Sequence, residues 1–213
     1  MTPARLLLTL FGLATVVDLG SLAVGADTGH LLTKPLLMPL LAVYAALRGA
    51  PRLLIAAVLC GWAGDTLLLS DADPAFLAGM AAFAAGHVCY LVLFTRIGTP
   101  REYAALLAPA YAAALVGTVV LLWPDLPPEL RVPVAVYSTL LTVMAYTAAT
   151  RIGLLAGMGG ALFLLSDTLI ATGVADWPQP PVPDLWIMLT YAAAQFLLVH
   201  GTLGPVRQPA LTT

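Results

Sequence analysis

Two aspartates stand in strongly apolar stretches of this 213-residue sequence. Asp65 and Asp167 lie 167 − 65 = 102 residues apart, and each is followed by Thr-Leu and then by another aliphatic residue. An ionisable side chain inside an apolar span is costly, and by default it marks a functional site. The alternative is a structural hydrogen bond between helices, but two buried carboxylates cost more than such bonds usually return. Asp65 and Asp167 are therefore predicted to be catalytic.

Two carboxylates in a poorly hydrated pocket can divide the work of acid–base catalysis. Burial and repulsion keep a proton on one, whereas hydrogen bonds can keep the other ionised. The acid can then donate its proton, and the carboxylate can stabilise a cation or activate water. This pairing suits a reaction with an oxocarbenium-like transition state, such as glycoside hydrolysis.

A zinc hydrolase is less well supported by the sequence. No His-x-x-x-His or Glu-x-x-His pattern occurs, and the three histidines are far apart. Cys60 and Cys89 both fall inside apolar stretches, which argues against a disulfide framework or a cysteine-based zinc site. We predict neither a metal nor a cofactor.

Few other polar side chains fall inside the apolar stretches. Tyr191 and Gln195 are four residues apart and His87 and Tyr90 three, so each pair shares one face of a helix. His30 and His200 lie near the ends of stretches and are predicted to be exposed or interfacial, and for Asp18 a structural or loop-proximal role is favoured. Without caps and loops, the polar set is Asp18, Lys34, Asp65, His87, Asp167, Tyr191 and Gln195.

Thr33-Lys34-Pro35 has the pattern of a helix start, with Thr33 as N-cap and Pro35 in the first turn. Such a start would join the lysine ammonium to the positive end of a helix, which favours phosphate binding. The alternative for Lys34 is a side chain that reaches to the membrane interface without binding anything.

The composition indicates an integral membrane protein. The chain is 61% hydrophobic and only 9% charged, whereas soluble domains carry about 25% charged residues. No basic run suggests nucleic-acid binding. We expect a single all-α transmembrane domain over residues 1–213, embedded in the bilayer. Eight apolar stretches are near the ~20 residues that cross a bilayer: 4–24, 34–48, 51–70, 74–97, 102–123, 131–150, 152–174 and 184–204.

Charged residues sort by side if eight spans are drawn. Most of the basic residues then fall on the side of the N-terminus, which the positive-inside rule places in the cytoplasm with the C-terminus. An odd number of spans would scramble this sorting. The basic set is Arg5, Arg48, Arg52, Arg96, Arg101, Arg151 and Arg207, and the opposite side carries Asp27, Asp71, Asp73, Asp125, Glu129, Asp176 and Asp184 with Lys34 and Arg131. All seven polar residues of the apolar stretches lie at or beyond the midplane, away from the cytoplasm.

A weak internal repeat accompanies this arrangement. Tyr44 and Tyr146 are offset by 146 − 44 = 102 residues, the same offset as the two aspartates. Four spans per half would preserve direction, which predicts parallel repeats about an axis along the membrane normal. Chance similarity among Leu- and Ala-rich helices is the alternative.

Several of these motifs, taken in order, resemble the YhhN family of bacterial lysoplasmalogenases and their animal relatives. The resemblance extends from about residue 30 to 201. Trp62 departs from it, because many members have a small or polar residue there. The motifs are Lys34-Pro35, Gly64-Asp65, Gly86-His87-x-x-Tyr90, Ser166-Asp167 and Tyr191-x-x-x-Gln195 with Gly201.

The resemblance implies an eight-helix enzyme of the bacterial inner membrane that hydrolyses the vinyl ether bond of lysoplasmalogen. The products would be a fatty aldehyde and glycerophosphoethanolamine or glycerophosphocholine. Asp65 and Asp167 match the family's catalytic positions. The residues expected to bind the lysophospholipid are Lys34, His87, Tyr90, Ser166, Tyr191 and Gln195.

Three other interpretations remain. A different intramembrane lipid hydrolase would use the same residues on an ester, amide or glycosidic bond. A proton-coupled transporter would need polar residues through both halves of the membrane, and the inner half has almost none. A structural helix bundle without chemistry would tolerate loss of both aspartates.

Overall fold

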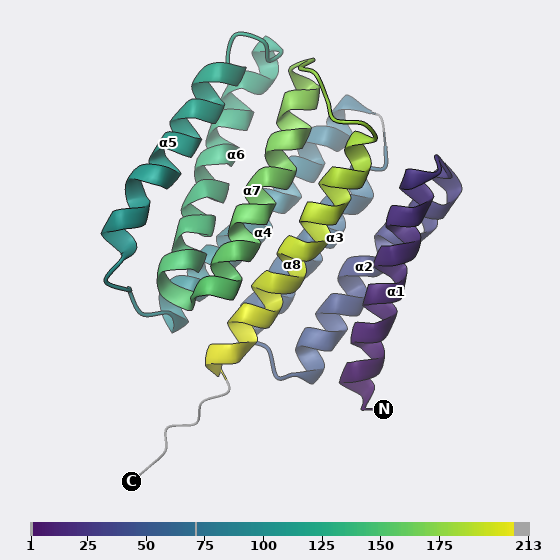
Figure 1. Ribbon diagram of the computed structural model, residues 1–213, viewed down its shortest axis with the longest axis vertical. Helices are drawn as coiled ribbons and strands as arrows, with labels where there is room; N and C mark the ends of the chain where they lie inside the picture. The colour runs from purple at the N-terminus through teal and green to yellow at the C-terminus, as the bar shows by residue number, and fades with distance from the viewer. Residues whose placement is uncertain (1, 71, 207–213) are drawn as a thin grey trace. The chain divides into compact units, whose positions relative to one another are not determined.

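The computed structural model describes residues 2–70 and 72–206, and every regular element in this part of the chain is helical (Figure 1). The all-α prediction is therefore confirmed. Asp71 and Arg207, two of the charges used above, lie outside the described residues. The helices are α1 (Pro3–Ala23), α2 (Asp27–Leu47), α3 (Arg52–Leu67), α4 (Asp73–Ile97), α5 (Ala104–Leu122), α6 (Pro128–Thr147), a π-helical turn η1 (Ala148–Ile152), α7 (Leu154–Val174) and α8 (Pro183–Val206).

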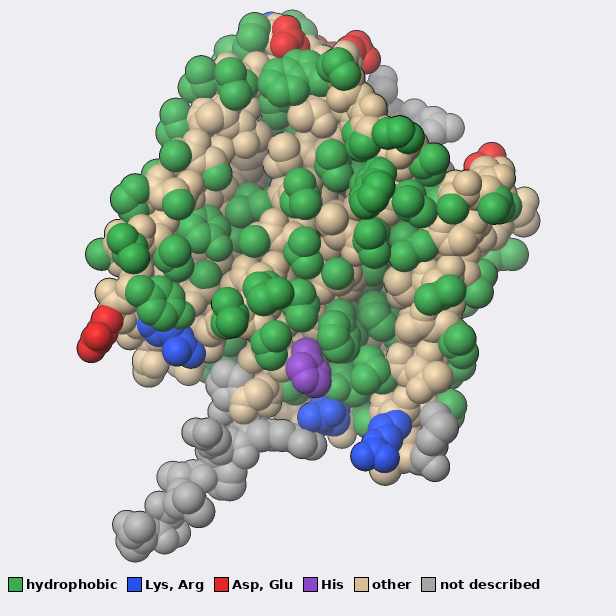
Figure 2. Space-filling model, in the orientation of Figure 1, with side chains coloured by type: hydrophobic (Ala, Val, Ile, Leu, Met, Phe, Trp, Pro, Cys, Tyr) green, Lys and Arg blue, Asp and Glu red, His purple; other side chains and the backbone are tan. Residues whose placement is uncertain are grey.

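Seven of the helices in the described part of the chain are long and apolar enough to cross a membrane. Their sides carry many exposed aliphatic residues, such as Leu106 at 78% and Val16 at 68% exposure, and apolar side chains dominate the visible helix sides (Figure 2). An exposed apolar face of this extent is what lipid tails cover. The structure thus supports an integral membrane protein. The helix that does not qualify as a span is α3, which has 16 residues.

Predicted and observed helix boundaries agree to within three residues, except at the start of α2. This helix begins at Asp27, with Ala26 as N-cap, so the predicted start at Thr33-Lys34-Pro35 is wrong. The Thr33 hydroxyl lies 2.8 Å from the carbonyl oxygen of Gly29, four residues back, as expected inside a helix. Pro35 therefore lies inside α2 rather than at its start. A proline lacks only its own N–H, and membrane helices tolerate that loss when another group donates to the freed carbonyl.

The chain forms two compact units. The first unit holds residues 1–93 and 199–213, and thus α1, α2, α3 and most of α4. In it α1 packs on α2 and α2 on α3. Its buried core includes Leu37, Leu41 and Tyr44 of α2 with Leu54 and Val58 of α3.

The second unit holds residues 94–198, with α5, α6, η1, α7 and most of α8. Its helices α6 and α7 meet at the π-helical turn, where widening leaves carbonyl groups without their usual donors. Arg101 Nη2 donates to the Ile152 carbonyl of this turn at 2.9 Å, and Arg151 Nη1, from the turn itself, donates to the Gly98 carbonyl at 3.2 Å. The turn and the α4–α5 loop are thereby held together.

Candidate active site

Asp65 lies near the C-terminal end of α3 and is buried, with 3% exposure. Its neighbour Gly64 lets α4 approach closely. A Cβ atom on Gly64 would lie 2.5 Å from Cε2 of Phe83, whose ring therefore packs on the α3 backbone beside the aspartate. Glycine here is a packing requirement, and it fixes which part of α4 meets Asp65.

His87 and Tyr90 are both buried on α4, each with 1% exposure. Gly86 packs against α3, since a Cβ on it would lie 3.1 Å from the carbonyl oxygen of Ala57 and 3.3 Å from the Cβ of Cys60. The pairings of Gly64 with Phe83 and of Gly86 with Ala57 show that α3 and α4 run antiparallel. The structure therefore brings Asp65, His87 and Tyr90 onto one packed helix pair.

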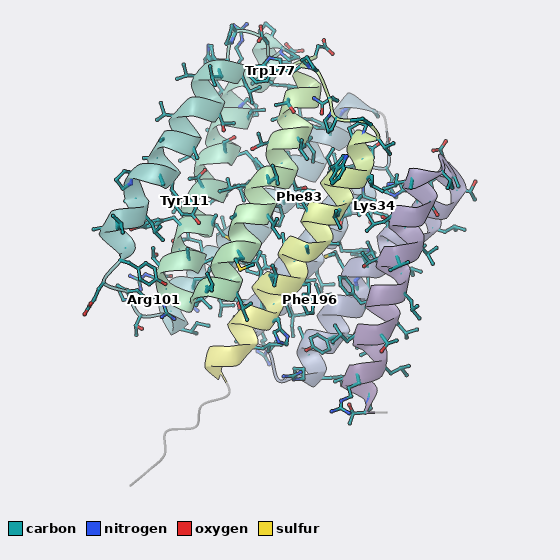
Figure 3. The ribbon with its side chains drawn as sticks, in the orientation of Figure 1. Lys34, Phe83, Arg101, Tyr111, Trp177 and Phe196 are labelled. Atoms are coloured by element: carbon teal, nitrogen blue, oxygen red, sulfur yellow. The ribbon has the colours of Figure 1, made fainter. Side chains whose placement is uncertain are left out.

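Lys34 is half-buried within α2 (Figure 3), and its neighbour Pro35 contacts α3. Pro39 has no N–H to donate to the carbonyl of Pro35, four residues before it. The indole Nε1 of Trp62 donates to that carbonyl instead, at 3.0 Å. Trp62 precedes Asp65 by three residues, so this contact links the Lys34 segment of α2 to the helix face that carries the aspartate.

Asp18 of α1 is fully buried and bonded to α2, which the sequence did not reveal. Its Oδ1 lies 3.0 Å from Nδ1 of His30 and 2.6 Å from the hydroxyl of Thr33. Within the described residues, Oδ2 has no hydrogen-bond partner. His30, expected to be exposed or interfacial, has a side chain that is only 16% exposed and contacts this carboxyl group. The structural role favoured for Asp18 fits these contacts.

In the second unit, Asp167 of α7 accepts a hydrogen bond from the hydroxyl of Tyr137 on α6. The sequence analysis missed Tyr137. A tyrosine in the middle of an apolar helix is itself a signal, because its hydroxyl needs a polar partner when it is buried.

Ser166, Tyr191 and Gln195 lie between α7 and α8, with exposures of 1%, 3% and 1%. The Ser166 hydroxyl donates to the Ile187 carbonyl at 3.1 Å, and the ring of Tyr191 stands edge-on to Phe163 at 5.4 Å between centroids. Gln195 Nε2 donates to the Tyr191 hydroxyl at 3.3 Å. The predicted i, i+4 pair is therefore a bonded pair.

Each unit thus holds one of the two predicted catalytic aspartates. In the first unit Asp65 shares the α3–α4 helix pair with His87 and Tyr90. In the second unit Asp167 accepts a hydrogen bond from Tyr137, and Ser166, Tyr191 and Gln195 lie between α7 and α8. Among the described residues, no three His, Cys, Asp or Glu side chains are grouped so that they could hold a metal ion.

Comparison with known proteins assigns the chain to a protein family. The profile of the YhhN family matches residues 29–202. The chain belongs to the YhhN family. The resemblance stated from the sequence motifs is confirmed. The match begins inside α2, so α1 precedes the part shared with the YhhN profile.

Curated relatives of this YhhN chain carry the name lysoplasmalogenase. Lysoplasmalogenase TMEM86B of Sus scrofa is 39% identical over 142 residues, which are 67% of this chain and 59% of that protein. The Homo sapiens protein of the same name is 36% identical over 165 residues, 78% of this chain and 68% of the relative. A lysoplasmalogenase of Mycobacterium tuberculosis is 31% identical over 193 residues, 82% of this chain and 72% of the relative. No solved structure matches significantly.

Proposed function

We propose that this YhhN protein is a membrane lysoplasmalogenase, which hydrolyses the vinyl ether bond of lysoplasmalogen. The observation that carries the proposal is that relatives named lysoplasmalogenase match it over most of its length. Buried acidic residues on α3 and α7 supply chemistry that suits this reaction. The products are a fatty aldehyde and glycerophosphoethanolamine or glycerophosphocholine.

The reaction begins with proton transfer from Asp65 or Asp167 to the vinyl carbon beta to the ether oxygen. This forms an oxocarbenium ion, and the other aspartate, as carboxylate, stabilises it and orients a water molecule. Water adds to the cationic carbon and loses a proton to a carboxylate, which gives a hemiacetal. The hemiacetal collapses to the aldehyde and the glycerol hydroxyl, so that one water is consumed and no redox partner is needed.

The neighbouring side chains orient these groups. Tyr137 holds the carboxylate of Asp167 through its hydroxyl. In this proposal His87, Tyr191 and Gln195 orient the attacking water and the carboxyl groups. Tyr90 and Ser166 contribute to binding of the lysophospholipid. Lys34 binds the substrate phosphate as a half-buried cation within α2, without the helix N-terminus that the sequence had suggested.

The topology belongs to the same proposal. All eight helices cross the inner membrane of a bacterium, as one catalytic domain with both termini in the cytoplasm. The 16 residues of α3 span about 24 Å, against ~30 Å of hydrocarbon, so α3 crosses where its ends are flanked by protein. Eight crossings preserve the sorting of charges, and seven would not. Helices α2–α4 and α6–α8 form the two halves of the repeat.

Aldehyde release from purified lysoplasmalogen by the detergent-solubilised protein tests the proposal directly. Asp65→Asn and Asp167→Asn should each abolish most of the release while the protein remains folded. Asp27→Asn is the matched control, because Asp27 is exposed at the start of α2. If neither the wild-type protein nor the control releases aldehyde, the proposed activity is refuted. Cleavage of ester, amide or glycosidic lipids in the same panel, without vinyl ether cleavage, would support another lipid hydrolase.

A further inference from the structure

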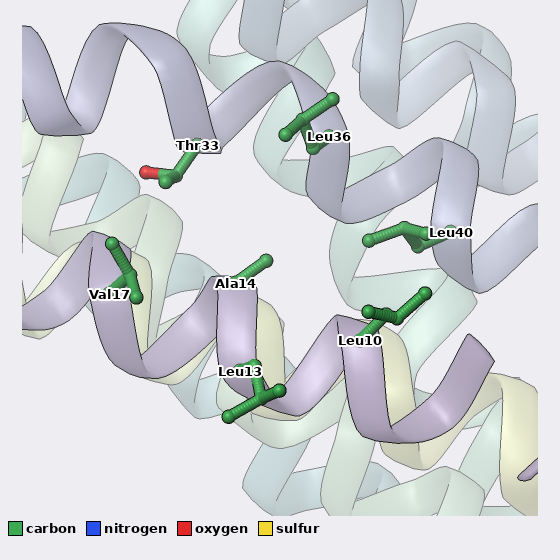
Figure 4. Close-up of a pocket in the computed structure, with 7 residues that line it drawn as sticks. All are labelled: Leu10, Leu13, Ala14, Val17, Thr33, Leu36 and Leu40. Carbon is green, nitrogen blue, oxygen red and sulfur yellow. The ribbon is translucent and has the colours of Figure 1, made fainter. Parts of the chain in front are cut away.

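A groove of about 390 Å³ runs between α1 and α2 (Figure 4). Six of its seven lining residues are apolar, and the seventh is Thr33 at one end. A groove with such a surface inside a membrane accepts a hydrocarbon chain and no polar ligand along most of its length. The lining residues are Leu10, Leu13, Ala14 and Val17 of α1 with Thr33, Leu36 and Leu40 of α2.

The end of the groove at Thr33 is polar. The Thr33 hydroxyl bonds to Asp18, and His30 bonds to the same carboxylate oxygen, so this cluster ties α1 to α2 where the groove ends. Lys34 follows Thr33 in α2. Lys34 forms no ion pair within the part of the chain that the structure describes. Its charge therefore remains available for an anion at this end.

The groove is apolar along most of its length and polar at one end, as a single-chain phospholipid is. From Leu10 to Val17, α1 rises about 10 Å, which is most of one ~15 Å hydrocarbon leaflet. A lipid chain lying along it would place its headgroup near Thr33 and Lys34, where an ammonium can pair with the phosphate. A second chain would lie outside the groove, so the shape of the groove favours a lysophospholipid over a two-chain lipid.

The polar end is also connected to the helix that carries an aspartate. Pro35, directly after Lys34, accepts the Trp62 indole N–H, and Trp62 lies three residues before Asp65 on α3. In a lysoplasmalogen the vinyl ether adjoins the glycerol and thus the headgroup end of the chain. A lipid held by Lys34 therefore has its reactive bond near the segment of α2 that contacts α3.

We propose that the α1–α2 groove binds the alkenyl chain of the lysophospholipid substrate, with the phosphate at Lys34. This inference rests on the proposed function and names the substrate-binding surface for it. Four of the seven lining residues lie on α1, which precedes the residues matched by the YhhN profile. In this proposal the first helix therefore contributes to chain selectivity.

Ala14→Trp tests the groove by filling it, and Val16→Trp is the matched control. Both residues are on α1, but Val16 is 68% exposed and does not line the groove. The indole would occupy the space of the lipid chain. We expect its cost to binding to be similar to that of overpacking a core, which corresponds to about a tenfold loss of affinity. Ala14→Trp should raise KM for a long-chain lysoplasmalogen about tenfold, with kcat little changed, and Val16→Trp should leave both constants unchanged. Ala14→Leu, a smaller change, should give an intermediate KM.

A binding measurement separates this inference from the activity. Lysophosphatidylcholine with a diazirine in its ester-linked chain has no vinyl ether, and it can be photo-crosslinked to the protein in nanodiscs of unlabelled phosphatidylcholine. Crosslinks should map to residues 10–17 and 36–40, and Ala14→Trp but not Val16→Trp should remove them. Equal crosslinking in both variants would overturn the groove assignment. It would also be overturned if a two-chain diazirine phosphatidylcholine labels the groove and excess lysophosphatidylcholine does not reduce that labelling. Failure of aldehyde release with crosslinking intact would refute the hydrolase and leave the binding site.

Discussion

The helices α3 and α7 carry the two predicted catalytic aspartates. They share a packing arrangement but differ in the groups that contact the segments around Asp65 and Asp167. On each helix the residue before the aspartate faces the next helix of the chain. Gly64 packs against Phe83 of α4, whereas the Ser166 hydroxyl donates to the Ile187 carbonyl of α8. The same position is thus used once for close approach and once for a hydrogen bond.

The preceding helices differ more strongly. Tyr137 of α6 donates to Asp167, and the residue 137 − 35 = 102 positions earlier is Pro35 of α2, which has no hydroxyl. Its carbonyl instead accepts the indole N–H of Trp62. The two halves of the proposed repeat therefore surround their carboxylates differently, and a pair of acids with different surroundings can hold different protonation states.

Tyr44 and Tyr146, the second pair related by the 102-residue offset, have also diverged. The Tyr44 hydroxyl accepts from Arg48 Nη1 at 2.9 Å, whereas the Tyr146 hydroxyl donates to the Ala104 carbonyl at 3.1 Å. A tyrosine can do either, so the residue type is kept while its partner changes. Such divergence is expected if the halves have separate roles.

Loss of either carboxylate is the largest effect that the comparison predicts. Asp65→Asn and Asp167→Asn should each lower kcat about 100-fold or more, because acid–base groups contribute 10²–10⁴-fold to the rate. The double variant should be little worse than either single one, since the two groups act as a unit. Initial rates of aldehyde release measure this. A variant that keeps wild-type kcat would show that its aspartate is not part of the chemistry.

Tyr137→Phe should lower kcat about tenfold, because a hydrogen bond to a charged group contributes about 1.5–3 kcal/mol. The control is Tyr111→Phe on α5, since Tyr111 packs edge-on against Tyr146 and not against Asp167. Steady-state kinetics of both variants decide the matter. If the two phenylalanine variants have the same kcat, the Tyr137–Asp167 hydrogen bond does not contribute to catalysis.

Gly64→Ala should destabilise the protein by about 1–3 kcal/mol, the usual cost of overpacking, because the added Cβ meets the ring of Phe83. Phe83→Leu in the same chain should restore part of the stability. Gly117→Ala is the control, since nothing lies within 4 Å of a Cβ there. Thermal unfolding in detergent provides the measurement, and equal melting temperatures for the two alanine variants would argue against the close α3–α4 contact.

Trp62→Phe has the smallest predicted effect, about 1 kcal/mol, because it removes the donor to the Pro35 carbonyl but keeps an aromatic ring. Pro39→Ala in the same chain should compensate, since alanine restores the N–H that the carbonyl would receive within the helix. Thermal unfolding of the single and double variants measures the coupling. Strictly additive changes would mean that Trp62 does not replace the missing N–H.

The sequence alone determined the membrane class, the all-α fold, the family and the ends of most helices. The class, the fold and the helix ends follow from local composition, since a run of some twenty apolar residues identifies a span whatever it packs against. The family follows instead from the resemblance of the ordered motifs. The sequence also singled out Asp65 and Asp167, because a carboxylate in an apolar run is conspicuous without any knowledge of its partners.

Only the tertiary structure decided what those residues touch. The Tyr137–Asp167 bond, the Asp18–His30 pair and the α1–α2 groove all depend on how helices are rotated about their axes. The start of α2 at Asp27 also came only from the structure, because the pattern at Thr33-Lys34-Pro35 indicated a later start. A helix that is apolar all round has no polar stripe to reveal its rotation. Its orientation is set by close contacts with other helices, as at Gly64 and Phe83, which no local pattern in the sequence encodes.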